Sequence, residues 1–252
     1  GPHPFVMQMR DDGGKLLEGI RIEDMGIKTV ANDLDNARVW FHKVRLPKTA
    51  LLNKYCRIID DKYVQTGTER MRIEVIGQRL LTGRMAIAQA ALFYAMSLHM
   101  KTEEYAKSKV CNGLAGETTL YAMPQVRTVF IESYAALEDM LSYTAGVEEG
   151  LNECLYQGII PDADLVEKIA VCKIRCISVA IQRVHLLQQE VGSYALMHDT
   201  GFELHDMLLT CKFAEGDSRI LQQKLTRDRL KRVQKAGLFN SLKAVFTSGS
   251  IR

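Results

Sequence analysis

The feature that most constrains the fold of this chain is a series of long helix-periodic segments after residue 65. In four of them, apolar residues recur every three or four positions, which is the spacing of one helix face. The segments are Gln78–Val110, Pro124–Leu155, Pro161–Val191 and Asp217–Gln234, with a shorter apolar segment at Met207–Leu209. Long helices joined by short connections predict a long antiparallel four-helix bundle.

The first 64 residues carry a different pattern, which indicates antiparallel strands. Phe5–Met9 is apolar, Asp11–Gly14 is a turn signal, and Ala37–Leu46 is a strand pattern closed by Pro47. The predicted class is therefore α+β and mainly α. We expect the end of a β domain at 1–64, a helical-bundle domain at 65–238 and a tail at 239–252. Because a strand pattern begins almost at residue 1, we also expect part of a fold to precede it.

The charge composition argues against two classes of partner. The 252 residues include 33 basic and 30 acidic side chains, closely mixed, with a net charge of +3. This balance does not favour a nucleic acid or a membrane surface, and the basic run Arg227–Arg232 reads as a solvated helix face. The sequence has no apolar run of 18 residues, so it predicts no membrane span.

The six cysteines are scattered and form no CxxC pair, which favours a reducing compartment. Cys172 and Cys176 share one helix face, and either a redox or metal pair or two small core residues would explain them; we favour the core. His99, His185 and His205 lack the helical partners of a metal site, so we expect packing or surface roles.

Glu215 occupies the stretch Cys211–Leu221, where it precedes a glycine and the last predicted helix. A glutamate at a helix start can simply complement the positive end of the helix dipole. It can also be a catalytic base. Gly83, isolated inside the first long helix, indicates close packing at that point.

Five motifs, in order along residues 5–235, resemble the acyl-CoA oxidase and acyl-CoA dehydrogenase superfamily, with a leaning to the oxidases. They are Gly19–Lys28, Asp35–Phe41, Val44–Leu52, Tyr105–Lys109 and Glu215–Ser218. The resemblance implies the end of the family's β domain followed by its C-terminal bundle.

The resemblance also implies a chemistry. Its enzymes use FAD to convert a fatty acyl-CoA thioester to the trans-2-enoyl-CoA, and it makes Glu215 the base that removes the α proton. The β hydrogen leaves as hydride to flavin N5, and the Glu215 N–H is one donor to the enolate oxygen. Carried over, the cofactor-binding positions are Lys109, Gly113, Gly192 and Asp217.

Several positions depart from the family pattern. Lys109 occupies the position of an arginine in the family. A lysine keeps the positive charge but cannot donate two parallel hydrogen bonds to a pyrophosphate, as a guanidinium does. Cys111 and Asn112 replace a glutamine and a phenylalanine, and Ser193 follows Gly192 in place of a second glycine.

Two interpretations therefore stay open. The first is an FAD-dependent enzyme that binds acyl-CoA, as a homodimer or with a missing N-terminal portion. The second is a non-catalytic descendant that serves as a structural subunit of a larger assembly. The resemblance implies the peroxisome for an oxidase and the mitochondrion for a dehydrogenase.

Overall fold

A computed structural model describes residues 3–54, 56–66 and 69–235. The chain divides into two compact units, residues 1–79 and residues 80–252. The expected tail at 239–252 lies outside the described residues. The predicted class, α+β with mainly helices, is confirmed.

The first unit contains two antiparallel hairpins. Strand β1 (Ile20–Asp24) pairs with β2 (Ala37–Phe41), with Ile20 opposite Phe41. Strand β3 (Cys56–Ile59) pairs with β4 (Lys62–Gln65). The turn between β3 and β4 places Asp60 and Asp61 at φ +47° and +60°, the conformation of a tight hairpin that suits the twist of its strands.

The predicted strand Phe5–Met9 is wrong. Only an isolated bridge joins Phe5 to Leu51, because a 3-10 turn at Lys48–Ala50 interrupts the segment that would be its partner. The strand expected over Ala37–Leu46 ends at Phe41. Two residues later, Lys43 has a positive φ of 53° and turns the chain. The hairpin of β3 and β4 was not predicted.

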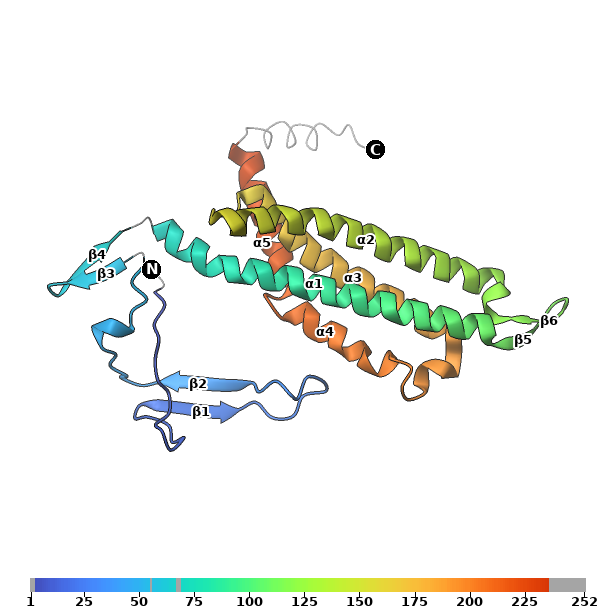
Figure 1. The fold of residues 1–252 in the computed structure, drawn as a ribbon, viewed down its shortest axis with the longest axis horizontal. Coiled ribbons are helices and arrows are strands. Elements are labelled where there is room, and N and C mark those ends of the chain that lie inside the picture. The colour runs from blue at the N-terminus through green and yellow to red at the C-terminus, as the bar shows by residue number, and fades with distance from the viewer. Residues whose placement is uncertain (1–2, 55, 67–68, 236–252) are drawn as a thin grey trace, which may run out of the picture. The chain divides into compact units, whose positions relative to one another are not determined.

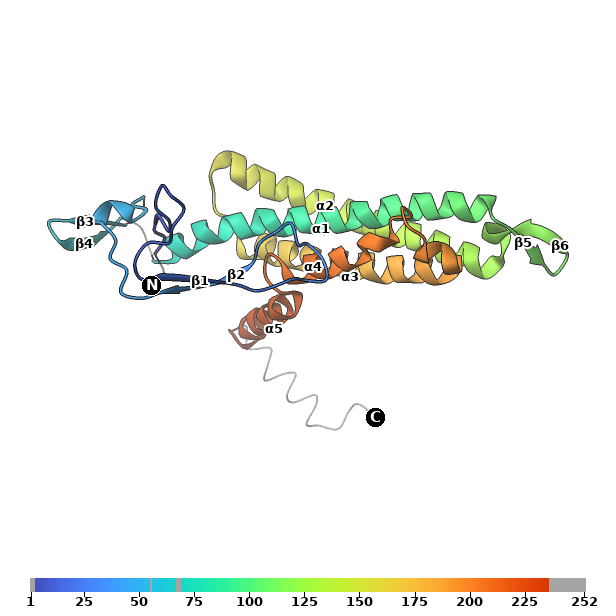
Figure 2. The same ribbon diagram turned by 90° about the horizontal axis from the view of Figure 1, so that it is seen from below.

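The second unit is a helical bundle. It contains α1 (Glu69–Ser108) from Leu80 onward, α2 (Pro124–Gln157), α3 (Ala163–Val191), α4 (His205–Phe213) and α5 (Ser218–Lys235). Helices α1, α2 and α3 run alongside one another (Figures 1 and 2), and α3 packs on α2, α4 and α5.

The ends of the helices follow from local sequence. Pro124 opens α2 at its first turn, and Gly158 closes it in the left-handed conformation at φ +67°. The Asp162 side chain caps α3 by accepting the Leu165 N–H at 2.8 Å. A short hairpin follows α1, formed by β5 (Val110–Gly113) and β6 (Gly116–Thr119), so the first helix ends two residues before the predicted Val110.

The core of the bundle lies between α1, α2 and α3. Small residues on α1 allow close approach to the larger side chains of α2 and α3. Cys172 and Cys176 are fully buried there, and the Thr144 Oγ lies 3.2 Å from the Cys176 Sγ, as expected for small core residues. Other fully buried members are Ala88, Leu92, Ala95, Phe130, Leu137, Ile169, Ile177, Ala180 and Leu187.

Candidate active site

Glu215 lies in a tight turn between α4 and α5, beside α1 (Figure 1). Its backbone is left-handed at φ +54°, and Gly216 follows at φ +96°. A left-handed backbone is costly for any residue with a Cβ and persists only where the surroundings fix it. The turn therefore needs strong local contacts, and two cations provide them.

Helix α1 supplies the first contact. The Arg84 Nε donates to the Glu215 carbonyl oxygen at 3.0 Å. The pKa of Arg84 is lowered by burial, and the nearby Glu215 carboxylate opposes that shift. One residue earlier, Gly83 leaves room for the Glu215 carboxylate: a Cβ at this position would lie 2.8 Å from Oε1 and closer still to Cδ and Oε2. The close packing predicted at Gly83 is packing against the Glu215 side chain.

Helix α3 supplies the second contact through Lys173, whose side chain is completely buried. Its Nζ donates to the carbonyl oxygens of Lys212 and Gly216, both at 2.7 Å, and to the Ser218 Oγ at 3.1 Å. Burial lowers the pKa of Lys173 to about 8, against the attraction of Asp217. The ammonium form therefore prevails at neutral pH and supplies three donors to three acceptors.

Sequence reasoning missed Lys173, although a signal was present. The lysine interrupts the apolar stripe that Ile169, Cys172 and Ile177 form on α3. A lysine on the buried face of a helix is rarely tolerated unless its charge is paired or its protons are hydrogen-bonded.

Asp217, and not Glu215, complements the positive end of the dipole of α5, which was the non-catalytic explanation for a glutamate at this position. Its Oδ1 accepts the Arg219 N–H at 2.7 Å and so caps α5. The carboxylate of Glu215 lies instead against α1. The N-terminus of α5 is thus already capped by Asp217, and the Glu215 carboxylate lies beside Gly83 on another helix.

The other predicted cofactor residues lie at the opposite end of the bundle, where the β5–β6 hairpin projects (Figures 1 and 2). Lys109 directly follows α1, and Gly192 directly follows α3. The rings of Tyr105 and Tyr194 stack at 3.7 Å and join these two helix ends. At 1.5 Å per residue, Ser108, which ends α1 just before Lys109, lies about 36 Å along the helix from Arg84. The chain therefore brings Lys109 and Gly192 together, and Asp217 and Glu215 together, as two separate groups.

The residues of the far group fit a phosphate-bearing cofactor in part. Lys109 is exposed, and a Cβ at Gly192 would meet no atom within 4 Å, so the chain there can be approached closely. Gly113 instead serves the hairpin, because a Cβ there would lie 3.0 Å from the Thr118 Cγ2. Cys111 and Asn112 belong to β5, directly after the predicted end of the first helix at Val110.

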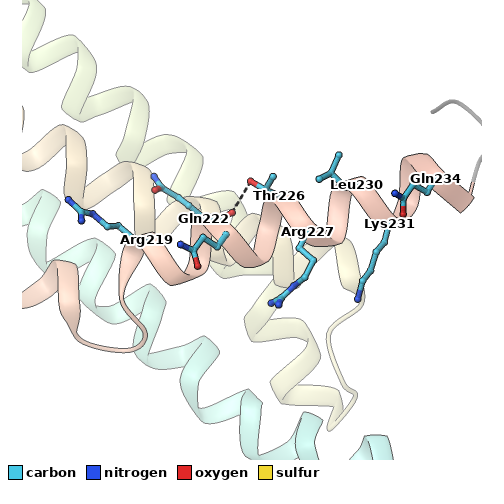
Figure 3. Close-up of a pocket in the computed structure, with 8 residues that line it drawn as sticks. Arg219, Gln222, Thr226, Arg227, Leu230, Lys231 and Gln234 are labelled. Carbon is cyan, nitrogen blue, oxygen red and sulfur yellow. Dashed lines mark hydrogen bonds between the residues drawn. The ribbon is translucent and has the colours of Figure 1, made fainter. Parts of the chain in front are cut away.

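A shallow depression along α5 is a separate feature (Figure 3). Its lining side chains all come from α5, and the Thr226 Oγ donates to the Gln222 carbonyl at 3.0 Å. It contains no carboxylate and includes Arg227 and Lys231 of the basic run for which the sequence predicts a solvated face. Arg229 and Arg232 of the same run instead pair with Glu167 on α3, so that prediction holds only in part. The lining residues are Arg219, Gln222, Gln223, Thr226, Arg227, Leu230, Lys231 and Gln234.

The histidines behave as packing and surface residues. His99 is buried with its Nε2 3.0 Å from the Phe130 carbonyl oxygen, and His185 is exposed. In the part of the chain that the structure describes, no group of three or more His, Cys, Asp or Glu side chains is placed to hold a metal ion. Among the described helices, none is both long and apolar enough to cross a membrane.

No protein-family profile matches the chain, but individual proteins do. Peroxisomal acyl-coenzyme A oxidase 3 of Arabidopsis thaliana is 37% identical over 97 residues, which are 38% of this chain and 14% of that protein. The solved structure of A. thaliana acyl-CoA oxidase 1 matches 99% of this chain with a TM-score of 0.74 at 19% identity, and the match covers 38% of that protein.

A Caenorhabditis elegans acyl-CoA oxidase solved with FAD and ATP matches 94% of the chain and 36% of its own length, with a TM-score of 0.66 and 20% identity. The chain thus spans well under half the length of each of these three proteins.

Proposed function

We propose that the chain, which resembles acyl-CoA oxidases in sequence and fold, belongs to the acyl-CoA oxidase and dehydrogenase superfamily. In this proposal it takes part in FAD-dependent α,β-desaturation of a fatty acyl-CoA, with Glu215 as the base. The observation that carries this proposal is the turn at Glu215. Its carboxylate is held against Gly83 on a left-handed backbone, while Asp217 caps the helix that follows. A strained residue fixed by its surroundings is typical of functional sites.

The chemistry needs a base aimed at a weakly acidic proton and a donor for the enolate oxygen that forms. Glu215 supplies the carboxylate, which takes the proton from the α carbon. Its own N–H forms no hydrogen bond within residues 3–54, 56–66 and 69–235, so it is available as one donor to the thioester oxygen. Bound FAD supplies the acceptor for the hydride that leaves the β carbon.

The cofactor assignments remain part of the proposal. Lys109 and Gly192 would meet the phosphates of FAD, with Gly113 shaping the hairpin beside them. Asp217 lies next to Glu215 and could reach a different part of the cofactor through its second carboxylate oxygen. Since about 36 Å separates the two groups along α1, one FAD would contact Lys109 of one chain and Glu215 of another. The proposal includes a homodimer and an acyl-CoA substrate. It also includes a peroxisomal location, which is supported by the peroxisomal acyl-CoA oxidases that the chain resembles.

The test is an absorbance spectrum of the protein from its native source, followed by addition of an acyl-CoA under nitrogen. We expect flavin bands that the acyl-CoA bleaches. Glu215→Gln should retain the bands and lower the rate of bleaching by about 10²-fold or more, because the base is lost. The exposed Glu104→Gln on α1 serves as the matched control and should bleach at the rate of the unmodified protein.

Full bleaching by Glu215→Gln would contradict the role of the base. A protein that takes up no flavin even with excess FAD would instead favour the structural-subunit interpretation. The departures at Lys109, Cys111 and Asn112, two of which lie in the β5 strand, are the observation behind that alternative.

A further inference from the structure

We propose that Lys173 is a positioning residue that holds the turn carrying Glu215 from both sides. The proposal rests on the proposed role of Glu215 and extends it to a side chain on another helix. The Lys173 ammonium donates to neither the carboxylate nor the backbone carbonyl of Glu215, but to groups before and after it. Its effect on Glu215 therefore acts through the backbone.

The geometry of the contacts supports this role. The three acceptors of the Lys173 ammonium belong to Lys212, Gly216 and Ser218, which lie before and after Glu215 in sequence. The Ser218 Oγ also donates to the Lys212 carbonyl at 3.1 Å and closes the loop on itself. One ammonium group thus joins the end of α4 to the start of α5.

The contacts also account for the unusual backbone of Glu215. The Lys212 carbonyl lies at the end of α4, where helix carbonyls lack partners within the helix, and a cation there is favourable. The Gly216 carbonyl follows the left-handed residue directly. Fixing these two oxygens from one point restricts the backbone between them, while Arg84 holds the Glu215 carbonyl from α1.

A purely structural explanation is less economical. The surrounding face of α3 is apolar, and an apolar residue of similar size at 173 would avoid the cost of burying a charge. The charges near the ammonium are Arg84 on α1, and Glu215 and Asp217 on the turn, together with the thiol of Cys211 on α4. A lysine in this setting is best explained by where its three acceptors lie, on the residues before and after Glu215.

The test compares Lys173→Met, which keeps an unbranched side chain one atom shorter and has no donor, with Lys168→Met on the same helix. Lys168 pairs with Asp164 at the surface, so its loss should leave the turn unchanged. Hydrogen exchange is measured on the 252-residue chain, with peptides over 212–219 compared with peptides in α2. We expect Lys173→Met to accelerate exchange in 212–219 by about tenfold or more, with a smaller change in α2.

The second measurement is the anaerobic bleaching of the flavin by an acyl-CoA in the natural holoprotein. Lys173→Met should lower the maximal rate by about tenfold or more and leave the half-saturating acyl-CoA concentration within about threefold, because a displaced base affects the reaction more than binding. Ser218→Ala removes only one acceptor, so it should accelerate exchange and lower the bleaching rate by a smaller factor, about severalfold. This second variant keeps the buried charge in place if Lys173→Met fails to fold.

Unchanged exchange over 212–219 in both variants would overturn the proposal. Faster exchange with an unchanged bleaching rate would also overturn it, since the turn would then be mobile without consequence for Glu215. If no acyl-CoA bleaches the flavin of the unmodified protein, the proposed function fails. The exchange experiment then still decides whether Lys173 holds the turn.

Discussion

At the scale of single residues, the site depends on what Glu215 is packed against. A left-handed glutamate costs about 1–2 kcal/mol relative to an ordinary backbone conformation. The contacts of Arg84 and Lys173 offset this cost, and Gly83 removes the side chain that would displace the carboxylate. Glycine inside a helix is itself unfavourable, so its presence at position 83 needs such a reason.

Gly83→Ala should therefore destabilise the chain, by about 1–3 kcal/mol, because the new methyl group meets the Glu215 carboxylate. Gly146→Ala on α2 is the control: a Cβ there meets nothing within 4 Å, so the same change should stabilise by about 0.5–1 kcal/mol. Chemical denaturation measures both. In a Glu215→Gly background the penalty of Gly83→Ala should disappear, and a penalty that persists would show that the two residues are not in contact.

At the scale of elements, α5 is attached to α3 by an ion-pair cluster. Glu167 on α3 is almost fully buried, and its two oxygens accept from Arg229 and Arg232 on α5. The hydrogen bond from Arg229 is the main cause of the lowered pKa of Glu167, which lies below the usual 4.5. A carboxylate with a lowered pKa stabilises the fold at pH values above its usual pKa, and that contribution is lost as the pH falls through the lowered value.

Glu167→Gln should consequently loosen α5 at neutral pH, since a neutral amide attracts two guanidinium groups less strongly. We expect amide exchange over 218–235 to accelerate by about threefold to tenfold. Acidification below the pKa of Glu167 should loosen α5 in the unmodified chain and change the variant less. Lys224→Ala, which removes an exposed pair within α5, is the control and should have little effect. Equal pH dependence in Glu167→Gln and the unmodified chain would contradict this account.

At the scale of the whole molecule, the separation of the two groups decides how many chains form a site. Lys109 and Gly192 lie at one end of the bundle, and Glu215 and Asp217 lie beside Arg84, about 36 Å away along α1. Under the proposed function, each site would be completed by a second copy of the chain.

A complementation experiment tests this arrangement. Lys109→Glu and Glu215→Gln should each abolish most of the acyl-CoA-dependent bleaching in the holoprotein. Mixed dimers carry one site with both changes and one site with neither, so dissociating and reassociating the two variants in equal amounts should restore about a quarter of the activity. Mixing without dissociation is the control. Activity that stays at the level of the separate variants would place both residues in one site of one chain.

The sequence by itself determined which segments form the long helices of this protein and where α2, α3 and α5 end, although α1 begins at Glu69 and not at the predicted Gln78. Apolar spacing, Pro124 and Asp162 act within a few residues of where they stand, so α2, α3 and α5 begin and end close to their predicted positions. Glu215 could be selected as a candidate base only through the family motifs, because its local position at a helix start is explained equally well by the helix dipole. The strand expected at Phe5–Met9 failed because pairing depends on a partner that Lys48–Ala50 interrupts.

Only the tertiary structure decided what surrounds Glu215. Gly83 and Arg84 lie more than a hundred residues away in sequence, and Lys173 is on a third helix, so no local pattern links them to the turn. The separation of Lys109 from Glu215 is likewise set by the length of α1. Helix formation responds to near neighbours in the chain, whereas a buried ammonium finds its acceptors only when packing brings distant segments together.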